Sequence, residues 1–124
     1  MSRFSDVREH PEFTHDKKKL AKRFRTIEED LEKLIDFELF LFHKLQRDNH
    51  GIFRIPGLGF EHPPVYKVKK FACRSIKGKG ANTGLRLIYA YFDADDGVEL
   101  IQLYFKERQG TDCDKDRIKR LYSK

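Results

Sequence analysis

The first half of the chain carries apolar residues at helical spacing. Pro11 suits the first turn of a helix, where its missing N–H removes no hydrogen bond. The apolar positions that follow lie on one stripe: Phe13, Leu20, Ala21 and Phe24. A capping box at Thr26–Glu29 predicts the start of a second helix, whose later part, Phe37–Phe42, is apolar on nearly every side. We therefore expect two consecutive helices, preceded by a short strand over Phe4–Glu9.

The second half of the chain carries the pattern of β-strands. A loop rich in Pro and Gly follows Gly51, and three segments rich in Val, Ile, Tyr and Phe come after it: Val65–Cys73, Leu85–Phe92 and Val98–Lys106. A last helix is predicted from Thr111 onward, with its apolar residues on one side. The predicted fold is α+β: a small antiparallel sheet of three to four strands, packed on one face by two N-terminal helices, with a short C-terminal helix. We expect one domain over residues 1–124.

Alternation along the strands predicts which side chains share a face. In the last strand, Ile101, Leu103 and Phe105 are expected to point one way. The opposite face should collect cations and a tyrosine from two strands: Lys67, Lys69, Tyr104, Lys106 and Arg108. Alternation does not decide the side of Arg86, because apolar residues occupy both parities of its strand. The prediction is a concave basic surface built from residues distant in sequence.

Positive charge is concentrated in the second half of the chain. Residues 1–62 hold 12 basic and 12 acidic side chains, whereas residues 63–124 hold 14 basic and 8 acidic, so the whole net charge of +6 lies there. No Asp or Glu occurs from His62 to Phe92. Cations beside aromatic rings attract a polyanion such as RNA. We expect RNA contacts from residues of this half: Lys70, Arg74, Lys77, Lys79, Tyr89 and Tyr104. The other interpretation is a solvated basic hairpin that only aids solubility.

Several kinds of site are not expected. The segment Gly78–Gly84 resembles a phosphate-binding loop, but the segment after it reads as a strand, not as the helix that such a loop requires. The five histidines and two cysteines show no metal-ligand spacing, so we expect neither a metal nor a cofactor. Cys73 and Cys113 lie 40 residues apart, and no apolar stretch is long enough to span a bilayer. A cytoplasmic protein with reduced thiols and no membrane partner is expected.

The strand segments resemble a known family. The sequences at 65–70, 84–89 and 103–106 are similar to the sheet of the RelE/ParE superfamily, the toxins of bacterial and archaeal toxin–antitoxin modules. The helix pair and the loop that ends in Pro-Pro-Val-Tyr are also similar, and the resemblance extends from Phe13 to Tyr122. It implies a RelE-like mRNA interferase, an endoribonuclease that enters the ribosomal A site. In such enzymes the ribose 2′-OH attacks the adjacent phosphate, and cations stabilise the charge that develops.

The resemblance also implies roles for individual residues. Lys67 and Lys69 match the strand lysines of the family, Arg86 matches its arginine, and Lys106 or Arg108 matches the basic position that closes the last strand. No Tyr or His follows at the place where many active members have one. The candidate general acid is therefore a tyrosine from elsewhere or a lysine; the tyrosines are Tyr122, Tyr104 and Tyr89.

The implied partners are mRNA, the ribosome and a cognate acidic antitoxin. The antitoxin is expected to cover part of Phe37–Phe42 or the basic sheet. Three other interpretations stay open at this point. The chain could be a ParE-type relative that inhibits a DNA topoisomerase, a decayed toxin without activity, or a basic RNA-binding domain unrelated to toxins.

Overall fold

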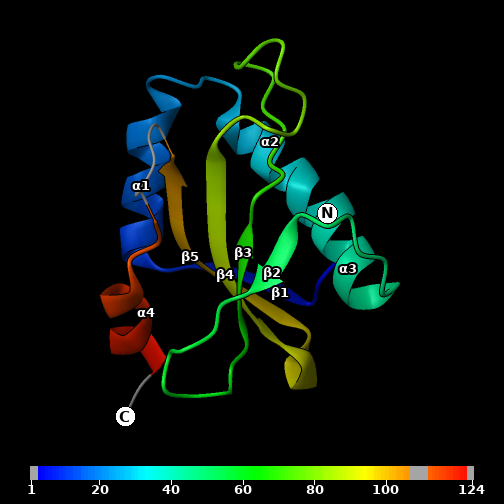
Figure 1. Cartoon of the computed structure of the whole chain (residues 1–124), viewed down its shortest axis with the longest axis vertical. Helices are drawn as coiled ribbons and strands as arrows, with labels where there is room; N and C mark the ends of the chain where they lie inside the picture. The colour runs from blue at the N-terminus through cyan, green and yellow to red at the C-terminus, as the bar shows by residue number, and fades with distance from the viewer. Residues whose placement is uncertain (1–2, 107–111, 123–124) are drawn as a thin grey trace.

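A computed structural model describes residues 3–106 and 112–122 (Figure 1). Five strands form one mixed sheet in the order β1-β5-β4-β3-β2, in which β1 runs parallel to β5 and all other neighbours are antiparallel. The strands are β1 (Asp6–Glu9), β2 (Ile52–Arg54), β3 (Val65–Val68), β4 (Leu85–Phe92) and β5 (Gly97–Phe105). The helices are α1 (Pro11–Ala21), α2 (Ile27–Lys33), the π-helical η1 (Leu34–Leu39), α3 (Phe40–Lys44), the 3-10 turn η2 (Asp93–Asp95) and α4 (Lys115–Tyr122).

The α+β class predicted from the sequence is confirmed, but the sheet is larger than expected, and it is mixed rather than antiparallel because β1 runs parallel to β5. Its additional strand is β2, which lies inside the segment predicted as a loop, because Ile52 pairs with Val68 and Arg54 with Tyr66. The expected strand over Val65–Cys73 ends at Val68. The second predicted helix is one continuous helical run from Ile27 to Lys44, in which η1 separates α2 from α3.

One face of the sheet packs against α1 and the α2–η1–α3 run. Their apolar stripes, including Phe13, Ile27 and Leu39, are buried against the odd-numbered residues of β4, which include Leu85 and Leu87. Because side chains alternate along a strand, the even-numbered residues of β4 point to the other face. This arrangement places Arg86 on the face opposite α2.

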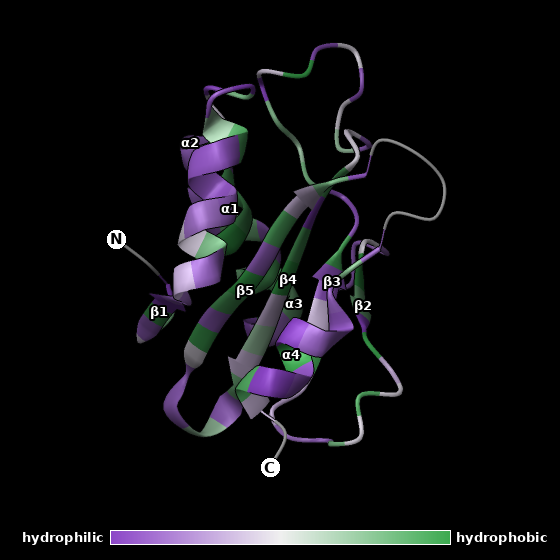
Figure 2. Ribbon diagram, turned by 90° about the vertical axis from the view of Figure 1, so that its left-hand side faces the viewer, coloured by the Kyte–Doolittle hydropathy of each residue, from purple (hydrophilic) through white to green (hydrophobic). Residues whose placement is uncertain are grey.

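The prediction that helices cover only one face is wrong. A second, smaller core lies on the other face, where Ile118 of α4 and residues of the 55–64 loop pack against Ile88 and Ile101. Figure 2 shows α4 in front of the lower part of the sheet, with hydrophobic positions along β4 and β5. The apolar side chains of α4 are removed from water because they pack on Ile88 and Ile101. Among the described residues, no helix covers the part of this face beyond α4.

A β-bulge in β5 corrects the predicted alternation. Ile88 pairs with Gln102 and Tyr89 with Leu100, so Ile101 is an additional residue without an opposite partner. A bulge of this kind reverses the parity of the residues before it relative to those after it. Ile101 therefore faces α4, although alternation predicted that it shares a face with Leu103, whose side chain is in the first core.

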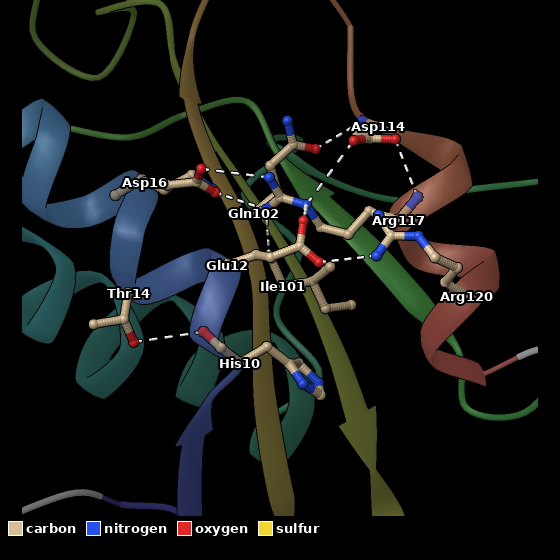
Figure 3. A network of polar contacts seen from close by, with 10 residues as sticks. His10, Glu12, Thr14, Asp16, Ile101, Gln102, Asp114, Arg117 and Arg120 are labelled. Carbon is tan, nitrogen blue, oxygen red and sulfur yellow. Dashed lines mark hydrogen bonds and ion pairs between the residues drawn. The ribbon is translucent and has the colours of Figure 1, made fainter.

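A polar network fixes α4 to the edge of β5 (Figure 3). β1 pairs with β5 only up to Leu100, which leaves the next part of that edge without a neighbouring strand. There, Asp16 of α1 accepts the backbone N–H of Leu103 at 3.2 Å. Arg117 of α4 donates to both the Asp16 carboxylate (2.7 Å) and the Ile101 carbonyl (2.8 Å). These contacts satisfy an otherwise exposed strand edge and hold α1 and α4 together across it.

Candidate nucleic-acid interface

Three neighbouring strands bring their side chains together at the open end of the second face. Lys67 comes from β3, Arg86 from β4 and Tyr104 from β5, and Lys69 directly follows β3. Arg86 pairs with Tyr104, and Lys67 pairs with Ile88, which lies on the same face as Arg86. Adjacent strands are roughly 4.8 Å apart, so these side chains are neighbours. We call the group formed by Lys67, Lys69, Arg86 and Tyr104 the cationic face.

Arg86 and Lys69 are the cations of this face that stay without a carboxylate partner among the described residues. The guanidinium of Arg86 donates to two backbone carbonyls, those of Lys69 (3.1 Å) and Leu85 (3.2 Å). The ammonium group of Lys69 lies 5.0 Å from the centre of the Phe53 ring on β2. The Arg86 contacts orient its side chain without neutralising its charge. Both groups are therefore available to an external anion such as a phosphate.

Lys67, in contrast, is already paired. Its ammonium group donates to the carboxylate of Asp112, which also accepts the backbone N–H of Cys113 at 2.7 Å. The hydrogen bond from Lys67, followed by that from Cys113, lowers the pKa of Asp112 to about 2. Asp112 is thus ionised at neutral pH and occupies the position at Lys67 that a phosphate oxygen would take.

Tyr104 keeps its proton at neutral pH. Burial raises the pKa of its hydroxyl, and the nearby Cys113 and Asp112 raise it further, against the opposing effect of Arg86. The side chain is partly buried against the second core. A protonated phenol beside Arg86 can donate a hydrogen bond or a proton.

The predicted RNA contacts in the loop after β3 do not join the cationic face, whereas Lys106, predicted as a catalytic cation, follows Tyr104 with the same parity. Lys106 is exposed after β5, and Lys77 and Lys79 are exposed in the loop after β3. Lys70 donates to the Asn49 carbonyl at 2.7 Å, and Arg74 forms ion pairs with two acids of α2, Glu29 and Asp30. Lys70 and Arg74 line a groove beside α2, on the side of the sheet away from Arg86. Arg108 lies outside the described residues.

Tyr89 cannot contact RNA in this structure, so that prediction is wrong. Its side chain is completely buried in the first core, and a hydrogen bond of 2.7 Å joins its hydroxyl to Nε2 of His43. Its ring also stacks on Tyr66, with 5.3 Å between the ring centres. Tyr89 has the same parity in β4 as Leu85 and Leu87, a signal that pointed to the core but that the apolar residues of the other parity obscured.

Tyr122 is not at the cationic face either, so its assignment as general acid there is wrong. Its hydroxyl donates to Glu99 at 2.6 Å and lies 3.2 Å from Nε2 of His10. Glu99 pairs with Ala90 of β4. Ala90 is four residues from Arg86, a distance of roughly 13 Å along a strand. Of the three tyrosines considered, Tyr104 is the one that lies beside Arg86.

Two members of this region were not found from the sequence. Phe53 lies on the short strand β2, where the surrounding Pro and Gly residues favoured a loop. Its neighbours, Ile52 and Arg54, alternate with it in the manner of a strand, and this weak signal was available. Asp112 is 45 residues from Lys67 in the chain, and no local pattern connects the two.

The described residues hold no group of three or more His, Cys, Asp or Glu side chains arranged to bind a metal ion. Within the same ranges, no helix has the length and apolar character needed to cross a membrane. Comparison with known proteins finds no family model, curated protein or solved structure that matches the chain.

Proposed function

We propose that the protein is an endoribonuclease of the RelE type, the toxin of a toxin–antitoxin pair, and that it holds the scissile phosphate of mRNA on the cationic face. One observation carries the proposal. Arg86 and Lys69, both without a carboxylate partner among the described residues, lie on one face of the sheet with the protonated Tyr104. This combination supplies positive charge and a proton donor at one place.

The chemistry needs no metal or cofactor. The ribose 2′-oxygen attacks the adjacent phosphorus and its proton passes to water, while the bond from phosphorus to the 5′-oxygen breaks. Arg86 and Lys69 stabilise the negative charge that gathers on the non-bridging oxygens. Loss of one such donor in other enzymes lowers the rate by about 10²–10³-fold. Tyr104 gives its proton to the leaving 5′-oxygen. The products are a 2′,3′-cyclic phosphate and a 5′-hydroxyl.

The proposal includes the partners that the family resemblance implies. The substrate is mRNA on a translating ribosome in the cytoplasm, and an acidic antitoxin neutralises the toxin. The exposed Lys77, Lys79 and Lys106 add positive charge for the RNA backbone outside the cationic face. Contacts of this kind bind phosphates without reading the base sequence.

The test uses the purified full chain with a labelled mRNA, free and on translating ribosomes. Cleavage should give fragments ending in a 2′,3′-cyclic phosphate. Binding should weaken steeply with salt, with a log–log slope of about −0.7 for each phosphate contacted on single-stranded RNA. If no cleavage occurs on free mRNA or on translating ribosomes, the proposal of an endoribonuclease is wrong.

A second candidate function is RNA binding without cleavage. The ion pair between Lys67 and Asp112 favours it, because one of the family's lysines is then not free to stabilise a transition state. In that case the salt-dependent binding should remain while no cyclic-phosphate ends form on any substrate. The same experiment therefore separates the two functions.

A further inference from the structure

A large groove lies on the opposite side of the sheet from the cationic face. It has a volume of about 870 Å³ and runs between the α2–η1 helical segment and the loop 70–81, which extends beside the start of α2 in Figure 1. Its walls are mainly apolar and include Leu34, Phe37, Cys73 and Ile76. Leu34 and Cys73 belong to the first core, so the floor of the groove is the packed interior of the protein.

Phe37 is the most unusual residue of this groove. Its side chain is 55% exposed, although Leu34 and Leu39 of the same segment are buried. It lies in η1, which is π-helical, and π-helical turns within α-helices are frequent at functional sites. The guanidinium of Arg3 lies 5.8 Å from the centre of the Phe37 ring. Together with the apolar walls of the groove, the ring forms a contiguous apolar surface of the kind that binds a partner.

The charges around the groove favour an acidic ligand. Its two carboxylates are already engaged: Asp30 accepts hydrogen bonds from Arg74 and Thr26, and Glu38 accepts one from Asn49 at 2.6 Å. The cations of the rim outnumber them: Lys33, Lys70, Arg74 and Lys77. Among the described residues, Lys33 and Lys77 have no carboxylate within ion-pairing distance. Their charges are available to a ligand on two sides of the apolar floor.

We infer that this groove binds an acidic, amphipathic peptide segment of a partner protein, with an apolar side chain against Phe37 and carboxylates at Lys33 and Lys77. A groove of this size holds several side chains, and apolar walls flanked by cations fit the two faces of such a segment. RNA fits less well, because apolar side chains, not polar groups, form the floor. Identification of the segment as part of an antitoxin rests on the proposed function, but the chemistry of the groove does not.

The experiment selects random peptides, long enough for four helical turns, on the immobilised full chain. The winning peptide is synthesised with a fluorescent label, and its affinity is measured by anisotropy. The winners should be rich in Asp and Glu and should carry Leu, Ile, Val or Phe on one helical face. Phe37→Ser, and separately the double variant Lys33→Glu/Lys77→Glu, should each weaken binding by about tenfold or more.

Matched controls come from other exposed residues. Leu45→Ser changes a residue that is 52% exposed but does not line the groove. Lys18→Glu/Lys19→Glu makes the same change of charge on α1. Both controls should keep the peptide affinity within about twofold of wild type. Thermal melting followed by circular dichroism verifies that each variant is folded.

The inference would be overturned if no peptides are enriched, if the selected peptides lack acidic residues, or if binding survives in the Phe37 and Lys33/Lys77 variants. Weaker RNA binding in Phe37→Ser, without any peptide binding, would assign the groove to RNA and would also overturn it. Arg86→Ala separates this inference from the proposed function, since it should weaken RNA binding and leave peptide binding unchanged. Each proposal can then fail without the other.

Discussion

The two faces of the sheet are built from the same strands but differ in whether they carry charged side chains. On the helix-covered face, β4 places Leu85, Leu87 and Tyr89, all completely buried. On the other face, which we call the open face, the same strand places Ile88 and Ala90 under α4. Arg86 lies beyond the end of that helix. Residues that point to the two faces alternate along β4, and a charged residue occurs only at a position that is not buried. A cation is found where the covering elements stop.

The titratable groups follow the same division. On the covered face, His43 of α3 stacks on Tyr91 with 4.1 Å between the ring centres and contacts the hydroxyl of Tyr89. Burial lowers the pKa of His43 to about 4, although Asp96 opposes this, so the imidazole is neutral at pH 7. On the open face, Arg86 and Lys69 have no carboxylate partner among the described residues. The covered face therefore contributes to stability, and the open face is the one suited to binding an anion.

The largest effect is expected when the open face loses its central cation. Arg86→Ala should lower the rate of RNA cleavage by about 10²–10³-fold, because Lys69 alone then remains to stabilise the charge on the phosphate oxygens. The measurement is the rate of formation of cyclic-phosphate ends at saturating RNA.

Arg74→Ala is the control for that variant, because it also removes one arginine but from the other side of the sheet. It should leave the cleavage rate within about threefold of wild type. Equal losses in the two variants would mean that overall charge, rather than the geometry of the cationic face, governs the activity.

Acid should destabilise the covered face through His43. Its pKa is 6.5 in an ordinary environment and about 4 in the fold, so the unfolded chain binds the proton first. Stability is therefore complete above pH 6.5 and decreases as the pH falls toward 4, by roughly 3 kcal/mol in total. Urea unfolding at several pH values measures this slope.

His43→Gln should remove most of the slope between pH 6.5 and 4, because the amide keeps a polar group near Tyr89 but does not titrate. His15→Gln, on the exposed part of α1, should retain it. An unchanged slope in His43→Gln would show that other groups cause the acid sensitivity.

The covered part of the second face depends on the contacts that hold α4 against the sheet, and Arg117 makes several of them. Arg117→Met should lower the free energy of unfolding by about 2 kcal/mol, because Asp16 and the Ile101 carbonyl lose their donor in a nearly buried place. Arg120→Met, in the same helix but with a side chain that is 62% exposed, should change it by less than about 0.5 kcal/mol. Similar values for both would mean that the Arg117 network does not anchor α4.

The smallest effect concerns Lys67, the member of the cationic face that pairs with a carboxylate among the described residues. Asp112→Asn frees Lys67 and should strengthen RNA binding by up to about fivefold, the range expected for an exposed ion pair. Asp116→Asn makes the same change of net charge on α4 and should have a smaller effect, since Asp116 does not contact the cationic face. Filter binding at fixed salt compares the two. Weaker binding by Asp112→Asn would mean that Asp112 supports the site instead of competing for it.

The local pattern of the chain was sufficient for most of the elements, β2 excepted, and for the location of the charge. Helical spacing found α1 and the long helical run, and strand composition found β3, β4 and β5. These features depend on residues a few positions apart, which backbone geometry brings together in any fold. The accumulation of cations between His62 and Phe92 is also a property of the sequence alone.

Only the tertiary structure decided which of those residues meet. The bulge at Ile101 depends on the pairing of two strands, so alternation along β5 alone placed that side chain on the wrong face. Because α4 packs on the second face, Tyr122 contacts Glu99, and Asp112, just before the helix, contacts Lys67. The helices cover the face to which the odd-numbered residues of β4 point. Tyr89 is therefore buried, and Arg86 points to the opposite face. A sequence determines the period and the charge of each segment, but the partner across a strand or beneath a helix determines which side chain is buried and which cation stays free.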